Sequence, residues 1–325
     1  MLKEFAENFS KKYMVKVRAV LGPDAEDDKE VTLLNRSIAW TPSGITIESD
    51  PRHAELVLRE LGLNEDSKGS TTTGSKVVDD EDTKMLDKME TTKYRSVVAR
   101  LNYMCSDRPD IQYSDKELCR CMSSPTTTSW SRLKRLGRYL KDHPRLMIKF
   151  DHQYMDGTCR IDVFADTDYA GCGVTRKSTN GGCTLRGSHC LKAWASTQSV
   201  VALSSGEAEY YGLTKAGCVG IGMKSLYGDF MIDTTMEVHL HTDSTAAKGI
   251  ASRRGLGKLR HIEVQYFWLH DHFARKTFTL HKVLGTENPA DLMTKYLPEL
   301  MIIKCLMTMS MEYMSGRSIV APALV

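Results

Sequence analysis

The stretch between residues 160 and 211 constrains the fold most, because it places acidic side chains at the ends of two predicted elements. Its first segment, RIDVFADTDYAG, alternates apolar and polar residues before a polar turn, and this pattern predicts a strand that ends near Asp166. Its last segment, VALSSGEAEYYGL, predicts a helix that follows two capping serines and carries Glu207 and Glu209 in its first turn. We therefore expect carboxylates at a strand end and at a helix start.

Two later segments add one acid each. MEVHLHTDSTAAKGI predicts a second strand with Asp243 at its carboxyl end, and ENPADLMTKYL predicts a short helix that contains Asp291. The carboxyl ends of strands in an α/β sheet meet at one edge, which is where binding sites are built. Acids from four separate elements could therefore meet at that edge.

Convergent carboxylates repel each other and are costly to desolvate, so they persist where a divalent cation neutralises them. Oxygen ligands on rigid elements suit Mg²⁺ or Mn²⁺, and two such ions about 4 Å apart can clamp both oxygens of a phosphoryl displacement. This chemistry indicates a nuclease. The other interpretation is a set of unrelated surface acids, each of them solvated or capping a helix.

Six sequence strings make the assignment more specific, and they occur in this order: FADTDYAG, RKSTNGG, WASTQSVVALSSGEAEYYGL, HTDSTAAKGI, RHIEVQYFWLHD and NPADLMTKYL. The region that they span, residues 160–298, resembles the ribonuclease H domain of copia-type retrotransposon Pol polyproteins. The resemblance implies an α/β fold of the ribonuclease H type, a mixed five-stranded sheet with flanking helices. It also implies an enzyme that hydrolyses the RNA strand of an RNA–DNA hybrid with two Mg²⁺ ions, or with Mn²⁺.

Matching the family's motifs residue by residue gives Asp166, Glu209, Asp243 and Asp291 as the expected catalytic residues and metal ligands. Glu209 is preferred to Glu207 because the family's acid lies directly before the residue that opens the apolar helix face. Hybrid selectivity would come from 2′-hydroxyls read across a wide minor groove. The expected nucleic-acid contacts are basic or hydroxyl side chains near these acids: Arg176, Lys177, Ser205, Thr242, Arg253, Arg254, Lys258 and Arg260.

The first half of the chain also resembles a copia-type polyprotein, namely the end of its reverse transcriptase. YRSVVARLNYM, DRPDIQYSDKELCR and RLKRLGRYLKDHP look like its thumb and connection segments. They predict two helices separated by Arg108-Pro109, followed by a strongly basic amphipathic helix. The basic face of that helix is either a solvated surface or a surface that follows nucleic-acid phosphates.

The polymerase motif of paired aspartates is not expected in this chain. Its Asp-Asp pairs are Asp27-Asp28 and Asp79-Asp80, and each lies in a predicted loop without a flanking hydrophobic strand. We therefore expect no autonomous DNA polymerase activity. Two functions remain open: an active ribonuclease H, or a catalytically silent retrotransposon relic that serves only as a nucleic-acid-binding or structural module.

The sequence divides into five predicted segments. They are a partial palm-end α/β piece over residues 1–63, an acidic Ser/Thr-rich linker over 64–92, the helical thumb and connection segment over 93–151, the ribonuclease H-like domain over 152–298, and a Met-rich tail over 299–325. In the first segment, MVKVRAVLG alternates like a strand and TPSG predicts a hairpin turn. The tail predicts a packed or a frayed terminal helix.

Composition limits the environment in which the chain works. Nine cysteines without a C-x-x-C motif argue against a disulfide scaffold and for a reducing compartment. The amino-terminal segment has no signal-peptide pattern, and the Met-rich tail falls short of the roughly 20 apolar residues that span a bilayer. We expect a cytoplasmic location, in a virus-like particle, or a nuclear one, with no membrane partner. The expected partners are an RNA–DNA hybrid and the rest of a polyprotein.

Overall fold

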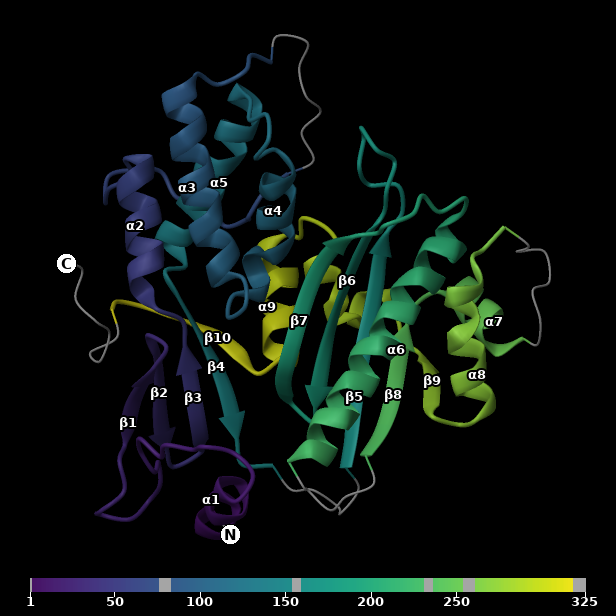
Figure 1. Cartoon of the computed structure of the whole chain (residues 1–325). Coiled ribbons are helices and arrows are strands. Elements are labelled where there is room, and N and C mark those ends of the chain that lie inside the picture. Colours follow the sequence, from purple (N-terminus) through teal and green to yellow (C-terminus); the bar gives the residue numbers. More distant parts are fainter. Residues whose placement is uncertain (1, 76–82, 154–158, 231–235, 254–260, 318–325) are drawn as a thin grey trace.

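The chain folds into two five-stranded sheets, with a group of helices packed between and above them (Figure 1). This computed structural model describes residues 2–75, 83–153, 159–230, 236–253 and 261–317. No helix in this described part of the chain is both long and apolar enough to cross a bilayer. The nine cysteines are all free thiols in this structure.

The first sheet is antiparallel throughout and has the strand order β1-β2-β3-β4-β10. Its strands are β1 Glu30–Leu33, β2 Arg36–Thr41, β3 Gly44–Glu48, β4 Arg145–Asp151 and β10 Met311–Met314. The predicted turn at TPSG is confirmed, because it joins β2 to β3. The segment VTLLNRSIAW before this turn forms a hairpin of its own, in which Leu34 and Asn35 have φ values of 51° and 62°.

The strand predicted over MVKVRAVLG is wrong. Residues 14–20 have no regular strand structure, and Val15, Val17 and Val20 are exposed. Alternating apolar residues form a strand only when a neighbouring strand satisfies the backbone groups and covers one face. No strand in the described part of the chain pairs with this segment.

The helices of the first half are α1 Leu2–Ser10, α2 Pro51–Leu61, α3 Lys88–Met104, α4 Pro109–Arg120 and α5 Thr127–Asp142. The two helices predicted on either side of Arg108-Pro109 are confirmed as α3 and α4. α3 begins inside the predicted linker, because Asp87 and Glu90 form a capping box at its start. The buried guanidinium of Arg108 contacts Asp110 at 2.7 Å and donates to the His143 carbonyl, which ties α4 to the end of α5.

The second sheet has the order β7-β6-β5-β8-β9. Its strands are β5 Cys159–Asp168, β6 Thr179–Arg186, β7 His189–Thr197, β8 Met236–Thr242 and β9 Phe278–Lys282. β5, β6 and β7 form an antiparallel meander, whereas β8 is parallel to both β5 and β9. The predicted mixed five-stranded sheet of the ribonuclease H type is therefore confirmed.

Helices cover both faces of this second sheet. α6 Ser205–Asp229 crosses one face (Figure 1) and lies so close to it that a Cβ on Gly220 would be 2.5 Å from a Val238 methyl carbon. α7 Thr245–Ser252 and α8 Trp268–Ala274 pack beside α6. The other face packs on α4 and on the short 3-10 helix Pro289–Met293.

Before β9, the described chain forms a 3-10 turn, Val264–Phe267, followed by α8. The carboxyl-terminal part differs from expectation in two places. The helix expected over 288–297 is the 3-10 helix Pro289–Met293. The tail does form a helix, α9 Glu299–Thr308, but then adds β10 to the first sheet beside β4. Buried residues of α9 and β10 belong to the core shared by the helices and both sheets.

The position of α9 in this core predicts a stability difference between two neighbouring side chains. Leu306 is 1% exposed and Met307 is 70% exposed. We expect Leu306→Ala to lower the free energy of unfolding by about 2–5 kcal/mol, because it opens a cavity. Met307→Ala should change it by less than about 0.5 kcal/mol. Urea denaturation measures both values, and equal losses in the two variants would contradict the packing of α9.

Candidate metal centre

Three acids from three elements meet at one edge of the second sheet. One carboxylate oxygen each of Asp166, Asp243 and Asp291 lies within 4.8 Å of the other two. Asp166 is near the end of β5, and Asp243 directly follows β8. Because these strands are parallel and in register, with Phe164 opposite His241, the two acids leave the sheet on the same face and at the same edge.

The 3-10 helix Pro289–Met293 brings the third acid to this edge, and polar contacts hold it there. The side chain of Asn288 caps this helix at the Ala290 N–H and donates to the Ala165 carbonyl at 3.0 Å. The Thr294 hydroxyl donates to Asp166 Oδ2. A Cβ on Gly181 would lie 2.4 Å from Thr294 Cγ2, so only glycine at this position of β6 allows the close approach.

Glu209 lies beside these three acids, in the first turns of α6. Burial, together with the charges of Asp166 and Asp243, raises the pKa of Glu209 to about 9. Its Oε2 atom is buried, and no hydrogen-bond partner for it is found among the described residues. Glu209 is not among the three acids that meet within 4.8 Å, but it is close enough to feel the charges of Asp166 and Asp243, and its buried Oε2 is used by no described group.

Glu207 is engaged elsewhere. It accepts hydrogen bonds from the Tyr211 hydroxyl at 2.6 Å and from the Leu203 N–H at 3.2 Å, and its Oε2 lies 2.9 Å from His261 Nε2. These contacts satisfy both carboxylate oxygens in a buried position. The geometry therefore favours Glu209 over Glu207 as the residue that faces the cluster.

The site carries more negative charge than its own cation neutralises. Burial and the charge of Asp166 raise the pKa of Asp291 to about 7, and the same two causes raise the pKa of Asp243. The ammonium of Lys295 lies 2.9 Å from Asp291 Oδ1 and 3.7 Å from Asp166 Oδ2. One lysine against four carboxyl groups leaves an all-oxygen donor set that fits a hard divalent cation such as Mg²⁺ or Mn²⁺.

A stack of histidines on the same face of the sheet was not foreseen. The ring centroids of His241 and His281 are 4.9 Å apart, as are those of His239 and His281, and Phe164 stacks on His241 at 4.4 Å. His241 Nε2 lies 2.6 Å from Asp162 Oδ1. The H-x-H spacing in MEVHLHT was the available signal, because it places both histidines on one face of a strand.

The expected nucleic-acid contacts are placed unevenly. Arg176 and Ser205 are exposed, whereas Lys177 and Arg253 are partly buried. Thr242 requires a correction: its side chain has no exposed surface and accepts the Ser244 N–H at 3.1 Å, which argues against a contact with a hybrid. The remaining three expected contacts, Arg254, Lys258 and Arg260, lie outside the described residues.

Comparison with known proteins relates the chain to mobile elements, although no family model matches it. The uncharacterized mitochondrial protein AtMg00810 of Arabidopsis thaliana is 33% identical over 182 residues, which cover 55% of this chain and 72% of that protein. The retrovirus-related Pol polyprotein from transposon RE2 of A. thaliana is 27% identical over 208 residues, which cover 63% of this chain and 14% of the polyprotein.

Among solved structures, the amino-terminal ribonuclease H domain of a Mycobacterium tuberculosis protein aligns at 15% identity with a TM-score of 0.33, covering 42% of this chain and 91% of that one. The chain spans about one seventh of the length of the RE2 Pol polyprotein. Over 63% of its length, the chain is homologous to the Pol polyproteins of copia-type retrotransposons.

Proposed function

We propose that the chain is a metal-dependent ribonuclease H that cleaves the RNA strand of RNA–DNA hybrids, with Asp166, Glu209, Asp243 and Asp291 as its catalytic residues and metal ligands. The observation that supports this most is the meeting of three carboxylates within 4.8 Å at the edge of a ribonuclease H-like sheet. The unused Oε2 of Glu209 adds a fourth donor. Like-charged groups at this density are stable where cations bind between them.

Two bound Mg²⁺ ions would supply an activated water and neutralise the charge that grows on the leaving oxygen. The chain's own residues orient the ligands. Asp166, held by the Thr294 hydroxyl on the central strand β5, is the most rigid acid and would be the ligand that the two ions share. Glu209 and Asp243 flank it from α6 and β8, and Asp291 lies across from them on the 3-10 helix. The Lys295 ammonium balances part of the negative charge. Its contacts with Asp166 and Asp291 would break when metal ions bind to these carboxylates.

The second candidate is a silent relic that binds nucleic acid without cleaving it. One observation favours it: the Lys295 ammonium already contacts two of the acids. For either candidate, we also propose the five-segment division of the chain, an RNA–DNA hybrid and the rest of a polyprotein as partners, and a cytoplasmic or nuclear location. Cleavage of a hybrid separates the two candidates.

Replacing the bridging acid tests the proposed activity. We expect Asp166→Asn to lower cleavage of a labelled RNA–DNA hybrid in Mg²⁺ by about 100-fold or more, because it removes a ligand that both ions share. The matched control is Asp229→Asn, which alters an exposed acid at the end of α6 and should leave the rate unchanged. Equal cleavage by all three proteins would point to a contaminating nuclease and support the silent relic.

The two glutamates of α6 are expected to behave differently. Glu209→Gln should weaken Mn²⁺ binding by about 10- to 100-fold in titration calorimetry, because it removes a ligand oxygen. Glu207→Gln should leave Mn²⁺ affinity unchanged and lower the free energy of unfolding by about 1–3 kcal/mol, because it disturbs buried hydrogen bonds. The reverse pattern would make Glu207 the ligand.

The stability of the metal-free protein should depend on pH in a defined direction. Folding raises the pKa of Asp291 from 3.8 to about 7 and that of Glu209 from 4.5 to about 9. Between these values the folded chain binds more protons than the unfolded chain, so the free energy of unfolding falls as the pH rises. In EDTA we expect thermal stability to decrease from pH 5 to pH 8. Added Mn²⁺ should reverse the loss at the higher pH, and a loss of the same size in Glu209→Gln would exclude Glu209 as its source.

A further inference from the structure

The three histidines of β8 and β9 meet at the edge of the second sheet. His239 Nδ1 lies 2.7 Å from His281 Nε2, and the planes of these two rings differ by 6°. The ring of His241 lies on the other side, with its centroid 4.9 Å from that of His281. His239 and His241 are 8% and 7% exposed, so the fold holds these imidazoles in place.

Two carboxylates determine which nitrogen of each β8 histidine carries the proton. Glu237 Oε2 lies 3.1 Å from His239 Nε2. In the same way, Asp162 Oδ1 lies 2.6 Å from His241 Nε2. An ionised carboxylate can only accept a hydrogen bond, so both Nε2 atoms carry hydrogen. In the neutral rings, both Nδ1 atoms then present a lone pair, which is what a histidine offers to a metal ion.

The protein itself uses these lone pairs only in part. His241 Nδ1 is buried and has no hydrogen-bond partner among the described residues. His239 Nδ1 accepts the hydrogen on His281 Nε2, which a metal ion replaces when it binds. Burial, together with the neighbouring His241 and His239, lowers the pKa of His281. The His281 ring is therefore neutral at physiological pH and is available as a ligand.

We propose that His239 Nδ1 and His281 Nε2 bind a divalent transition-metal ion, Zn²⁺ above all, with water completing its coordination. Imidazole nitrogen suits Zn²⁺, Cu²⁺ and Ni²⁺, whereas Mg²⁺ prefers oxygen. With Zn–N bonds of about 2.1 Å, two nitrogens of a tetrahedral site are about 3.4 Å apart, so the two rings need to separate by about 0.7 Å. Glu237 would keep its hydrogen bond to His239 Nε2, as carboxylates commonly do behind a metal-bound histidine.

A cation can reach this pair, and the charge around it is favourable. The Glu237 side chain is 62% exposed, so the pair is open to solvent on that side. Two carboxylates, those of Glu237 and Asp162, contact the β8 histidines, and one guanidinium, that of Arg160, pairs with Asp162. The local charge is therefore negative before a cation binds, and this attracts the ion.

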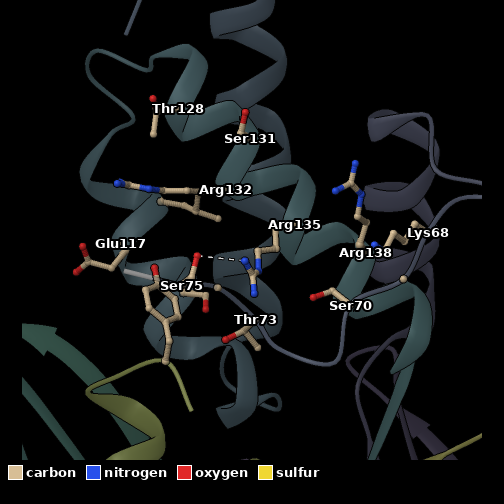
Figure 2. A pocket seen from close by; sticks show the side chains of 15 residues that line it. Lys68, Ser70, Thr73, Ser75, Glu117, Thr128, Ser131, Arg132, Arg135 and Arg138 are labelled. Carbon is tan, nitrogen blue, oxygen red and sulfur yellow. Dashed lines mark hydrogen bonds between the residues drawn. The ribbon is translucent and has the colours of Figure 1, made fainter. Parts of the chain in front are cut away.

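The histidine pair differs from the other places in the described chain where a ligand could collect. The acidic cluster offers oxygen, and Asp243 follows His239 by four residues, about 13 Å of extended strand. The cavity of about 440 Å³ beside α5 (Figure 2) is lined by cationic and hydroxyl side chains, with Glu117 as the one acid among its described lining residues. It therefore repels cations. Ligation by imidazole nitrogen thus identifies the histidine site, which does not rest on the proposed nuclease.

Cu²⁺ serves as a spectroscopic probe of this site, because its electron paramagnetic resonance spectrum shows hyperfine splitting from each nitrogen that it binds. The full-length chain receives one equivalent of Cu²⁺ in excess Mg²⁺, which occupies oxygen ligands. We expect splitting from two nitrogens in the wild type and its loss in His281→Gln. The matched control is His152→Gln, which replaces an exposed histidine after β4 and should leave the spectrum unchanged.

Zn²⁺ affinity gives a second measure. In titration calorimetry, again in excess Mg²⁺, we expect His281→Gln to weaken Zn²⁺ binding by about 10-fold or more. Glu237→Gln should weaken it by about 10-fold, because it keeps both ring nitrogens but removes the carboxylate that orients His239. Since Glu237 is exposed, this variant remains informative even if His281→Gln fails to fold.

Three results would overturn the proposal. The first is Zn²⁺ affinity that is unchanged in both His281→Gln and Glu237→Gln. The second is a wild-type Cu²⁺ spectrum without nitrogen splitting, which would place the ion on oxygen ligands. The third is nitrogen splitting that survives in His281→Gln but disappears in His152→Gln, which would place the ion on a surface histidine.

Discussion

Parallel pairing between β5 and β8 is the constraint on which the acidic site depends. It carries two chain segments separated by about 80 residues to the same sheet edge, in register, so that Asp166 and Asp243 face the same space. Backbone hydrogen bonds of the sheet, together with the Lys295 ammonium and the Thr294 hydroxyl, oppose the repulsion between these carboxylates. The 3-10 helix Pro289–Met293 covers the same face of the sheet, on a β6 backbone that has no side chain at Gly181.

One short segment links the acidic site to the helical half of the chain. Residues 291–296 supply an acid to the cluster, a lysine that partly neutralises it and, in Tyr296, a ring that lies against Gly74 of the segment after α2. Tyr296 also packs against Tyr113 of α4, with ring centroids 4.9 Å apart. The helical half and the sheet half therefore meet beside the acidic cluster, and a shift of this segment would affect both.

Local patterns were sufficient for much of the fold and for part of the site. Strand alternation, helix caps and Arg108-Pro109 predicted β5 and β8, α6 and the α3–α4 boundary, because each depends on neighbours in sequence. MVKVRAVLG failed as a strand because pairing needs a partner that local sequence does not specify. The H-x-H spacing places two histidines on one face of β8, but the third ring of the stack comes from β9, which local sequence does not bring beside them. The buried state of Thr242 was also beyond reach, since it arises from contacts between distant segments. The choice of Glu209 as a metal ligand rested on family motifs and stays a prediction; burial and the charges of Asp166 and Asp243 raise its pKa.

The pairing of β10 with β4 has a consequence for the order in which the chain folds. Met311 lies opposite Ile148, so one edge of the first sheet is supplied by residues made more than 160 positions later. During synthesis that edge of β4 presents unpaired backbone groups, which are prone to join strands of other chains. The first sheet is completed only after the whole second sheet has left the ribosome, and a proteolytic cut after α9 would expose the same edge again.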